Sequence, residues 1–218
     1  MFPVVFQTEP SRVSDLPTGV KDADAARWDA YYDATAGRPP RLTLLTALDR
    51  FDSVLPRCAV DLGCGDGRDT IALLSCGWSV IAIDAAPSAV ERLAARSDLP
   101  KNAVLTTRCG KFETTEWPAV DLVNSSFALP LCPPDAFPAL WDKITQSLKP
   151  DGRFAGQLYG SRDSWAGREG VTVFERENAR QLFQDYEIEL FDEEETDSVT
   201  PRGDAKHWHI FHVVARKR

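Results

Sequence analysis

The chain has 218 residues, of which 43% are hydrophobic, and a formal net charge of −8 at pH 7. This length suits one domain with a substantial buried core. The negative charge argues against a nucleic-acid partner, because binding to phosphates needs a basic surface. No apolar run approaches the length of a membrane span.

The N-terminus and the cysteines bear on the compartment. The first ten residues, MFPVVFQTEP, lack the basic start and the long apolar core of a signal peptide. Five cysteines occur without a C-x-x-C pair, which favours reduced thiols. We therefore expect a cytoplasmic protein without a membrane partner.

Residues 1–56 are expected to form an N-terminal arm followed by two helices. Met1 to Gly19 shows no periodicity and contains several prolines. Asp22 to Ala34 has helical spacing, with Trp28, Tyr31 and Tyr32 on one face. A second helix is predicted from the apolar side chains of Leu44, Ala47, Leu48 and Phe51.

From residue 57 to residue 218, strands and helices alternate in a way that predicts one α/β domain. The expected strands are Cys58–Leu62, Ser79–Ile83, Ala103–Thr107, Val120–Asn124 and Arg153–Tyr159. The clearest helix between them spans Pro134 to Leu148, and a later one spans Glu177 to Gln184.

The end of the chain departs from this alternation. Two further strands, Tyr186–Phe191 and Trp208–Val214, have only a polar linker between them, which includes Thr196 to Lys206. This linker is too short for a parallel crossover, so the two strands should be antiparallel.

A glycine-rich loop follows the first strand in the sequence VDLGCGDGRDT, residues 60–70. Gly63, Gly65 and Gly67 alternate with other residues, and a helix pattern follows them. A strand, a glycine loop and a helix in this order open nucleotide sites in doubly wound sheets. The dinucleotide motif G-x-G-x-x-G has a glycine where this chain has Arg68. The second strand is followed by Asp84, whose carboxylate can accept hydrogen bonds from ribose hydroxyls.

Asp61, the glycine loop and Asp84 together resemble the cofactor site of class I S-adenosylmethionine (SAM) dependent methyltransferases. The resemblance covers nearly the whole chain. It implies a Rossmann-like, doubly wound, seven-stranded sheet of order 3-2-1-4-5-7-6, with strand 7 antiparallel. The small-molecule branch, with its tellurite-resistance and thiopurine methyltransferases, is the most similar group.

The resemblance also implies which residues hold SAM. The loop and the end of the second strand contribute the first set, namely Asp61, Gly63, Cys64, Gly65, Gly67, Asp84 and Ala85. Phe112 and Glu113, in the turn after the third strand, are expected beside adenine. Asn124, at the end of the fourth strand, is expected near the methionine part of the cofactor.

The methyl acceptor is expected at the carboxyl edge of the sheet, where ligands bind in such folds. The candidate residues for this site are Trp28, Tyr32, Phe127, Tyr159 and Trp165. Aromatic residues on a helix face are more often core contacts, which is the alternative for Trp28 and Tyr32. His207 is a candidate base, and the acidic run from Asp192 to Glu195 would favour a neutral or cationic acceptor. No metal site is expected.

The leading hypothesis is transfer of a methyl group from SAM to an oxygen, nitrogen or sulfur atom of a small molecule, by a monomer or a homodimer. Two alternatives stay open at this point. One is a SAM-binding partner module without catalysis. The other is a nicotinamide-dependent oxidoreductase, against which Arg68 argues because it replaces the third glycine of the dinucleotide motif.

Overall fold

The computed structural model describes residues 28–52, 57–201 and 203–218. The predicted arm, Met1 to Gly19, lies outside them, as does the beginning of the predicted helix from Asp22. Residues 28–35 are helical. No helix among the described residues is both long and apolar enough to cross a membrane.

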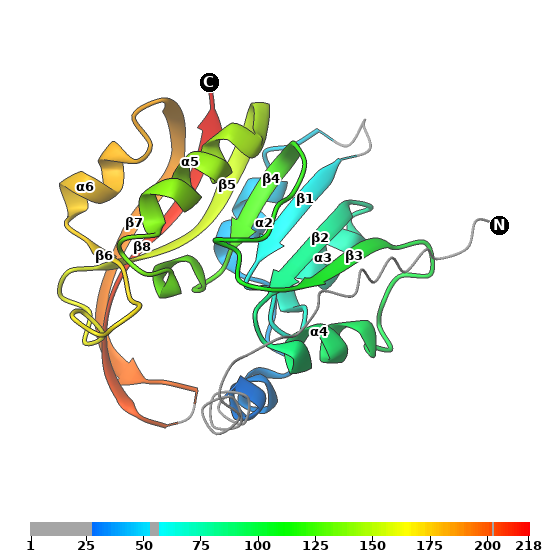
Figure 1. Cartoon of the computed structure of the whole chain (residues 1–218), viewed down its shortest axis with the longest axis horizontal. Helices are drawn as coiled ribbons and strands as arrows, with labels where there is room; N and C mark the ends of the chain where they lie inside the picture. The colour runs from blue at the N-terminus through cyan, green and yellow to red at the C-terminus, as the bar shows by residue number, and fades with distance from the viewer. Residues whose placement is uncertain (1–27, 53–56, 202) are drawn as a thin grey trace.

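The described chain forms one sheet with helices on both faces (Figure 1). Its strands are β1 Cys58–Leu62, β2 Ser79–Asp84, β3 Val104–Cys109, β4 Val120–Ser125, β5 Leu148–Gly160, β6 Val173–Phe174, β7 Tyr186–Val199 and β8 Ala205–Lys217. Its helices are α2 Leu42–Leu48, α3 Arg68–Ser75, α4 Pro87–Ala94, α5 Phe137–Ser147 and α6 Arg176–Gln181.

The strand order is β3-β2-β1-β4-β5-β8-β7, with the two-residue strand β6 paired to β5. Strands β1 to β5 pair in parallel, and β8 is antiparallel to both β5 and β7. This confirms the predicted sheet, because the short β6 only shifts the numbers of the last two strands.

Alternate strand residues face two separate apolar cores, as the period of two in a strand requires. On one face, Phe154 and Phe211 pack with the α5 residue Trp141. On the other face, Leu122 and Val214 pack with apolar side chains of α2, α3 and α4. The sheet is thereby fixed between two helical layers, and the carboxyl ends of its parallel strands are left for a site.

The last two strands are much longer than predicted, and this is the main correction to the expected elements. β7 continues through the acidic run to Val199, and β8 begins at Ala205, so the segment between the two strands is short. Figure 1 shows this hairpin continuing past β5 and curving toward the N-terminal helix. Cross-strand hydrogen bonds, such as that between His209 and Glu193, stabilise strand residues that no apolar alternation marks.

Candidate functional site

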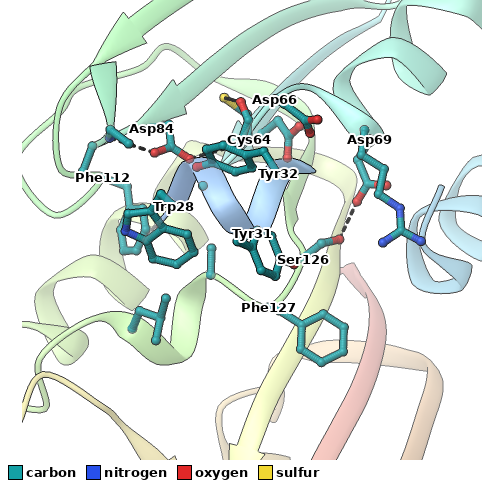
Figure 2. A pocket seen from close by; sticks show the side chains of 18 of the residues that line it. Trp28, Tyr31, Tyr32, Cys64, Asp66, Asp69, Asp84, Phe112, Ser126 and Phe127 are labelled. Carbon is teal, nitrogen blue, oxygen red and sulfur yellow. Dashed lines mark hydrogen bonds between the residues drawn. The ribbon is translucent and has the colours of Figure 1, made fainter. Parts of the chain in front are cut away.

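The glycine loop forms one wall of a cavity of about 390 Å³ at the carboxyl edge of the sheet (Figure 2). Gly63 and Gly65 have left-handed backbone conformations, with φ of 71° and 55°. A Cβ atom on Gly63 would lie 2.1 Å from the Cβ of Ala128, and one on Gly65 would lie 3.0 Å from the Tyr32 ring. These positions therefore need glycine for both conformation and space.

Gly67, the third glycine, has a different task. It does not line the cavity, and it precedes the first residue of α3 with a φ of 91°. A Cβ atom there would lie 2.3 Å from the Cδ1 of Leu93. Gly67 thus lets the loop turn into α3 and lets α4 pack closely behind it.

The carboxylate of Asp84 holds the loop from the end of β2. Its two oxygens accept hydrogen bonds of 2.9 Å from the backbone N–H groups of Gly65 and Ala86. Burial raises the pKa of this carboxyl, and the backbone hydrogen bonds oppose that shift. Asp84 lines the cavity beside Ala85, and each oxygen keeps a second lone pair with which it can accept a ligand hydroxyl.

Two buried carboxylates lie at the opposite end of the loop. Asp61 accepts hydrogen bonds from Thr70 Oγ1 at 2.6 Å and from Asn124 Nδ2 at 2.9 Å. The same Asn124 nitrogen lies 3.3 Å from Asp69, which also accepts hydrogen bonds from Ser126 and from the backbone N–H of Arg41. Burial, followed by the charge of Asp69, raises the pKa of Asp61 to about 7.

Asn124 is fully buried and does not line the cavity. It was expected to lie near the cofactor, but in the structure it lies behind the wall and joins the two carboxylates. Asp61 and Asp69 do line the cavity, so this end presents two acid groups that can pair with a cationic ligand group.

The turn after β3 is fixed by a residue that the sequence did not mark. Lys143 Nζ, from α5, donates to the carbonyl oxygens of Phe112, Glu113 and Thr115 at 2.9 to 3.0 Å. Phe112 and Glu113 both line the cavity. Lys143 therefore fixes the backbone of the turn that was expected to lie beside adenine.

The helix at residues 28–35 covers the loop. Tyr32 is 3% exposed and its ring packs on Gly65, so it belongs to the first cavity rather than to a separate acceptor site. Burial, followed by the charge of Asp84, raises the pKa of its phenol. Trp28 and Tyr31 lie beside it in Figure 2, with Trp28 stacked on Tyr32 at 6.3 Å between ring centroids.

A second cavity, of about 990 Å³, adjoins the first. The two share five lining residues, which are Trp28, Tyr31, Arg41, Phe127 and Leu131. Phe127 has a left-handed backbone with a φ of 59°, which is uncommon for a bulky residue and is held by a hydrogen bond from its N–H to Gln157. This strained residue lies at the junction of the two cavities.

The second cavity lies between the N-terminal segment and the long hairpin. Tyr159 and Trp165, both expected at the acceptor site, line it together with Trp208. These three rings surround the ammonium group of Lys206, which lies 4.1 Å from the Trp165 ring centroid and 4.3 Å from that of Trp208. The rings proposed to hold a cationic acceptor therefore already hold a cation of the chain itself.

The acidic run alternates between the two faces of the hairpin. Asp192 and Glu194 line the second cavity. Glu193 and Glu195 face the other side, where each pairs with Arg162. Only two of the four acidic side chains of this run therefore contribute negative charge to the second cavity.

His207 lines neither cavity and is not brought to the acceptor side. Its two ring nitrogens contact carboxylates, Asp197 at 2.8 Å and Glu195 at 3.2 Å, and these raise its pKa. The period of two in a strand predicts that His212 lies on the other face, and His212 does line the second cavity. Among the described residues, the arrangement thus offers His212 and not His207 to a bound molecule.

The part of the chain that contains the glycine loop matches a known protein family. Residues 59–152 match a family model described as a methyltransferase domain. This region contains the glycine loop, Asp84, the turn after β3 and Asn124. A search of curated protein sequences finds no match.

Several solved structures have the same fold. TehB from Haemophilus influenzae is 16% identical, with a TM-score of 0.71 over 88% of this chain and 67% of that one. A magnesium protoporphyrin IX methyltransferase from Synechocystis, with S-adenosylhomocysteine bound, has 15% identity and a TM-score of 0.66 over 91% and 98%.

A third structure contains both ligands. The 1,6-didemethyltoxoflavin-N1-methyltransferase from Burkholderia thailandensis, with that substrate and S-adenosylhomocysteine bound, has 21% identity and a TM-score of 0.60 over 94% and 93%. The family match favours SAM over a nicotinamide cofactor, and the glycine wall and the acid groups of the first cavity agree with SAM. Residues 59–152 therefore match a methyltransferase domain, and the described chain has the class I fold of SAM-dependent methyltransferases.

Proposed function

We propose that the protein transfers the methyl group of SAM to a small molecule bound in the second cavity. The observation that carries this proposal is the junction of the two cavities at Phe127, with one cavity walled by the glycine loop. A volume of about 990 Å³ is at the upper end of the range for small-molecule pockets. The similar structures named for methylation of small molecules agree with this choice of acceptor.

In the proposed arrangement, SAM lies along the glycine loop with its ribose at Asp84. Its adenine lies toward Phe112 and Glu113, and its ammonium lies toward Asp61 and Asp69. The bound sulfonium supplies an activated methyl carbon, so the chain's own task is to align the acceptor and exclude water. The aromatic residues Trp28, Tyr31 and Phe127 do both at the junction.

The test is turnover of SAM carrying a tritiated methyl group with a panel of small phenols, thiols, amines and carboxylic acids. We expect tritium transfer to at least one class, and none with S-adenosylhomocysteine in excess. A protein that binds SAM and transfers no methyl group to any class, but methylates a protein or a nucleic acid, would contradict the proposal. Its placement as a single domain in the cytoplasm, as a monomer or a homodimer, remains a prediction.

Asp84→Ala should weaken SAM binding by about 1.5–3 kcal/mol, the range for hydrogen bonds that involve a charged group. The variant loses the proposed ribose acceptor and also the acceptor for the Gly65 N–H. Calorimetric titration measures the loss. A 2′-deoxyribose analogue provides the control, because it should lose affinity for the wild type and little for the variant. If both proteins respond equally to the analogue, Asp84 does not hold the ribose.

Binding of SAM should release protons at mildly acidic pH. Asp61, whose pKa burial raises to about 7, is mostly protonated there in the free protein. The proposed ammonium contact favours the charged form, so the proton leaves on binding and SAM affinity falls as the pH decreases through this range. Calorimetry in two buffers of different ionisation enthalpy should detect a net release of protons near pH 6.5.

The matched variant for this measurement is Asp61→Asn, which keeps the shape of the side chain and does not titrate. The variant should release no proton from position 61. Any dependence of its SAM affinity on pH that is left then comes from titration of the ammonium group of SAM. If the variant and the wild type release equal numbers of protons, Asp61 does not lose a proton when SAM binds, and the proposed ammonium contact is wrong.

A further inference from the structure

His212 and Glu194 form a hydrogen-bonded pair on the cavity face of the hairpin. Nε2 of His212, on β8, lies 2.9 Å from Oε2 of Glu194, on β7. In the strand register His212 lies opposite Asp192, so Glu194 reaches it diagonally. The imidazole contacts Phe127 edge to face, with 6.3 Å between ring centroids. The pair is thus adjacent to the residue that joins the two cavities.

The hydrogen bond selects the tautomer of His212. An ionised carboxylate can only accept, so the proton of the neutral imidazole lies on Nε2. Nδ1 then carries a lone pair, and among the described residues it has no hydrogen-bond partner. The side chain is 21% exposed and lines the second cavity, so a molecule bound there can contact the imidazole.

The other two histidines of the chain are arranged differently. Both ring nitrogens of His207 lie against carboxylates, so its ring is held as a donor. His209 is buried, with Nδ1 accepting from the backbone N–H of Arg162 and Nε2 against Glu193. Among the described residues, His212 is thus the one histidine with a ring nitrogen that has a lone pair and no hydrogen-bond partner.

We propose that His212, oriented by Glu194, is the general base for an acceptor that carries a hydroxyl or thiol on an aromatic ring. This inference rests on the proposed function and names the acceptor class of the same site. The aromatic class follows from the ring walls of the cavity, and the base follows from the need to remove a proton from a weakly acidic O–H or S–H.

The step balances without a further reactant. The acceptor's oxygen or sulfur forms a bond to the methyl carbon, and its proton passes to Nδ1 of His212. The bond from the methyl carbon to the sulfonium sulfur breaks, with the electron pair left on sulfur. Glu194 stabilises the imidazolium that results, and the imidazolium then returns its proton to water.

Other titratable and charged groups face the same space and enter any pH profile. They come from every element around the cavity and are Tyr31, Arg38, Arg41, Tyr159, Asp192 and Asp197. Asp197 is already paired with His207. The test therefore compares variants at each pH rather than the shape of one profile.

The first measurement needs no acceptor. In protein labelled with ¹⁵N in its histidines, the nitrogen shifts report which ring nitrogen carries the proton, and His212→Gln assigns the signals. We expect His212 to carry its proton on Nε2, and Glu194→Gln to shift it toward a mixture of tautomers. A proton on Nδ1 in the wild type would overturn the proposal.

The second measurement is turnover at neutral and alkaline pH with paired phenols and aryl thiols. His212→Gln should lose about 100-fold in kcat for phenols, the lower range for general bases. It should lose little for aryl thiols that are already ionised, and alkaline pH should restore part of the phenol rate. His207→Gln is the matched control and should match the wild type. Equal losses for phenols and ionised thiols would mean that His212 has a structural role only.

Different results would contradict the acceptor class and the proposed function. If the wild type methylates only amines or carboxylic acids, the acceptor class is wrong while methyl transfer to a small molecule stands. If it methylates no small molecule, the proposed function fails, and the tautomer of His212 still shows whether the pair exists as described.

Discussion

A Gly65→Val variant should fold and lose measurable SAM binding. Gly65 has a φ of 55°, a conformation that a β-branched residue adopts only under strain. The added Cβ would lie 3.0 Å from the Tyr32 ring, and the two methyl groups beyond it need more space still. The loop can relieve this contact only by moving into the cavity or away from Asp84. Either movement removes the surface on which SAM is proposed to lie.

Gly77→Val is the control variant, because it introduces the same backbone strain as Gly65→Val at a position away from the cavity. Gly77 also has a left-handed backbone, with a φ of 82°, and a Cβ atom there would meet nothing within 4 Å. It follows α3 on the far side from the cavity and lines no part of it. The two variants should lose similar stability in thermal unfolding, whereas calorimetry should show SAM binding by Gly77→Val alone. Binding by Gly65→Val near the wild-type affinity would mean that the loop is not the cofactor site.

Local requirements of the backbone explain why the sequence predicts the loop and the sheet order. Gly63 and Gly65 are needed for their conformation and for space, and the buried strands are marked by short apolar runs. The antiparallel end follows from a linker too short for a crossover. These features depend on neighbours in the sequence, so they can be read without the tertiary structure.

The features that the sequence does not predict depend on partners distant in the chain. The length of the hairpin depends on cross-strand pairs, such as His212 with Glu194, in residues with no apolar alternation. Tyr32 packs on Gly65 from a helix whose position no local pattern determines. Lys206 is fully buried, although lysine is among the residues least often found inside proteins.

Breaking the ion pair of Lys206 and Asp163 should have a large effect on the free energy of unfolding. Both side chains are fully buried, and Asp163 also accepts hydrogen bonds from the backbone N–H groups of Trp165 and His209. Burial lowers the pKa of Lys206, and the hydrogen bond to Asp163 opposes that shift. The pair thereby joins the loop that carries Trp165 to β8 beside the second cavity.

Asp163→Ala should lower the free energy of unfolding by about 3–5 kcal/mol, the range for a buried ion pair that loses one partner. The variant leaves an unpaired ammonium group among aromatic rings and two backbone N–H groups without their acceptor. Urea denaturation measures the loss. The double variant Asp163→Ala/Lys206→Met should recover part of it, because the flexible apolar side chain of methionine replaces the lysine stem without a charge.

Glu187→Gln gives the matched control, because it breaks the exposed ion pair with Arg216 on the same hairpin. Exposed pairs contribute little, so its urea midpoint should stay close to that of the wild type. If Asp163→Ala loses no more than this control, the buried pair does not hold the hairpin to the loop. In the double variant, Trp165 and Trp208 lack the cation that they surround. If this variant regains stability while its turnover stays low, the ammonium group positions these two rings and is not needed for folding.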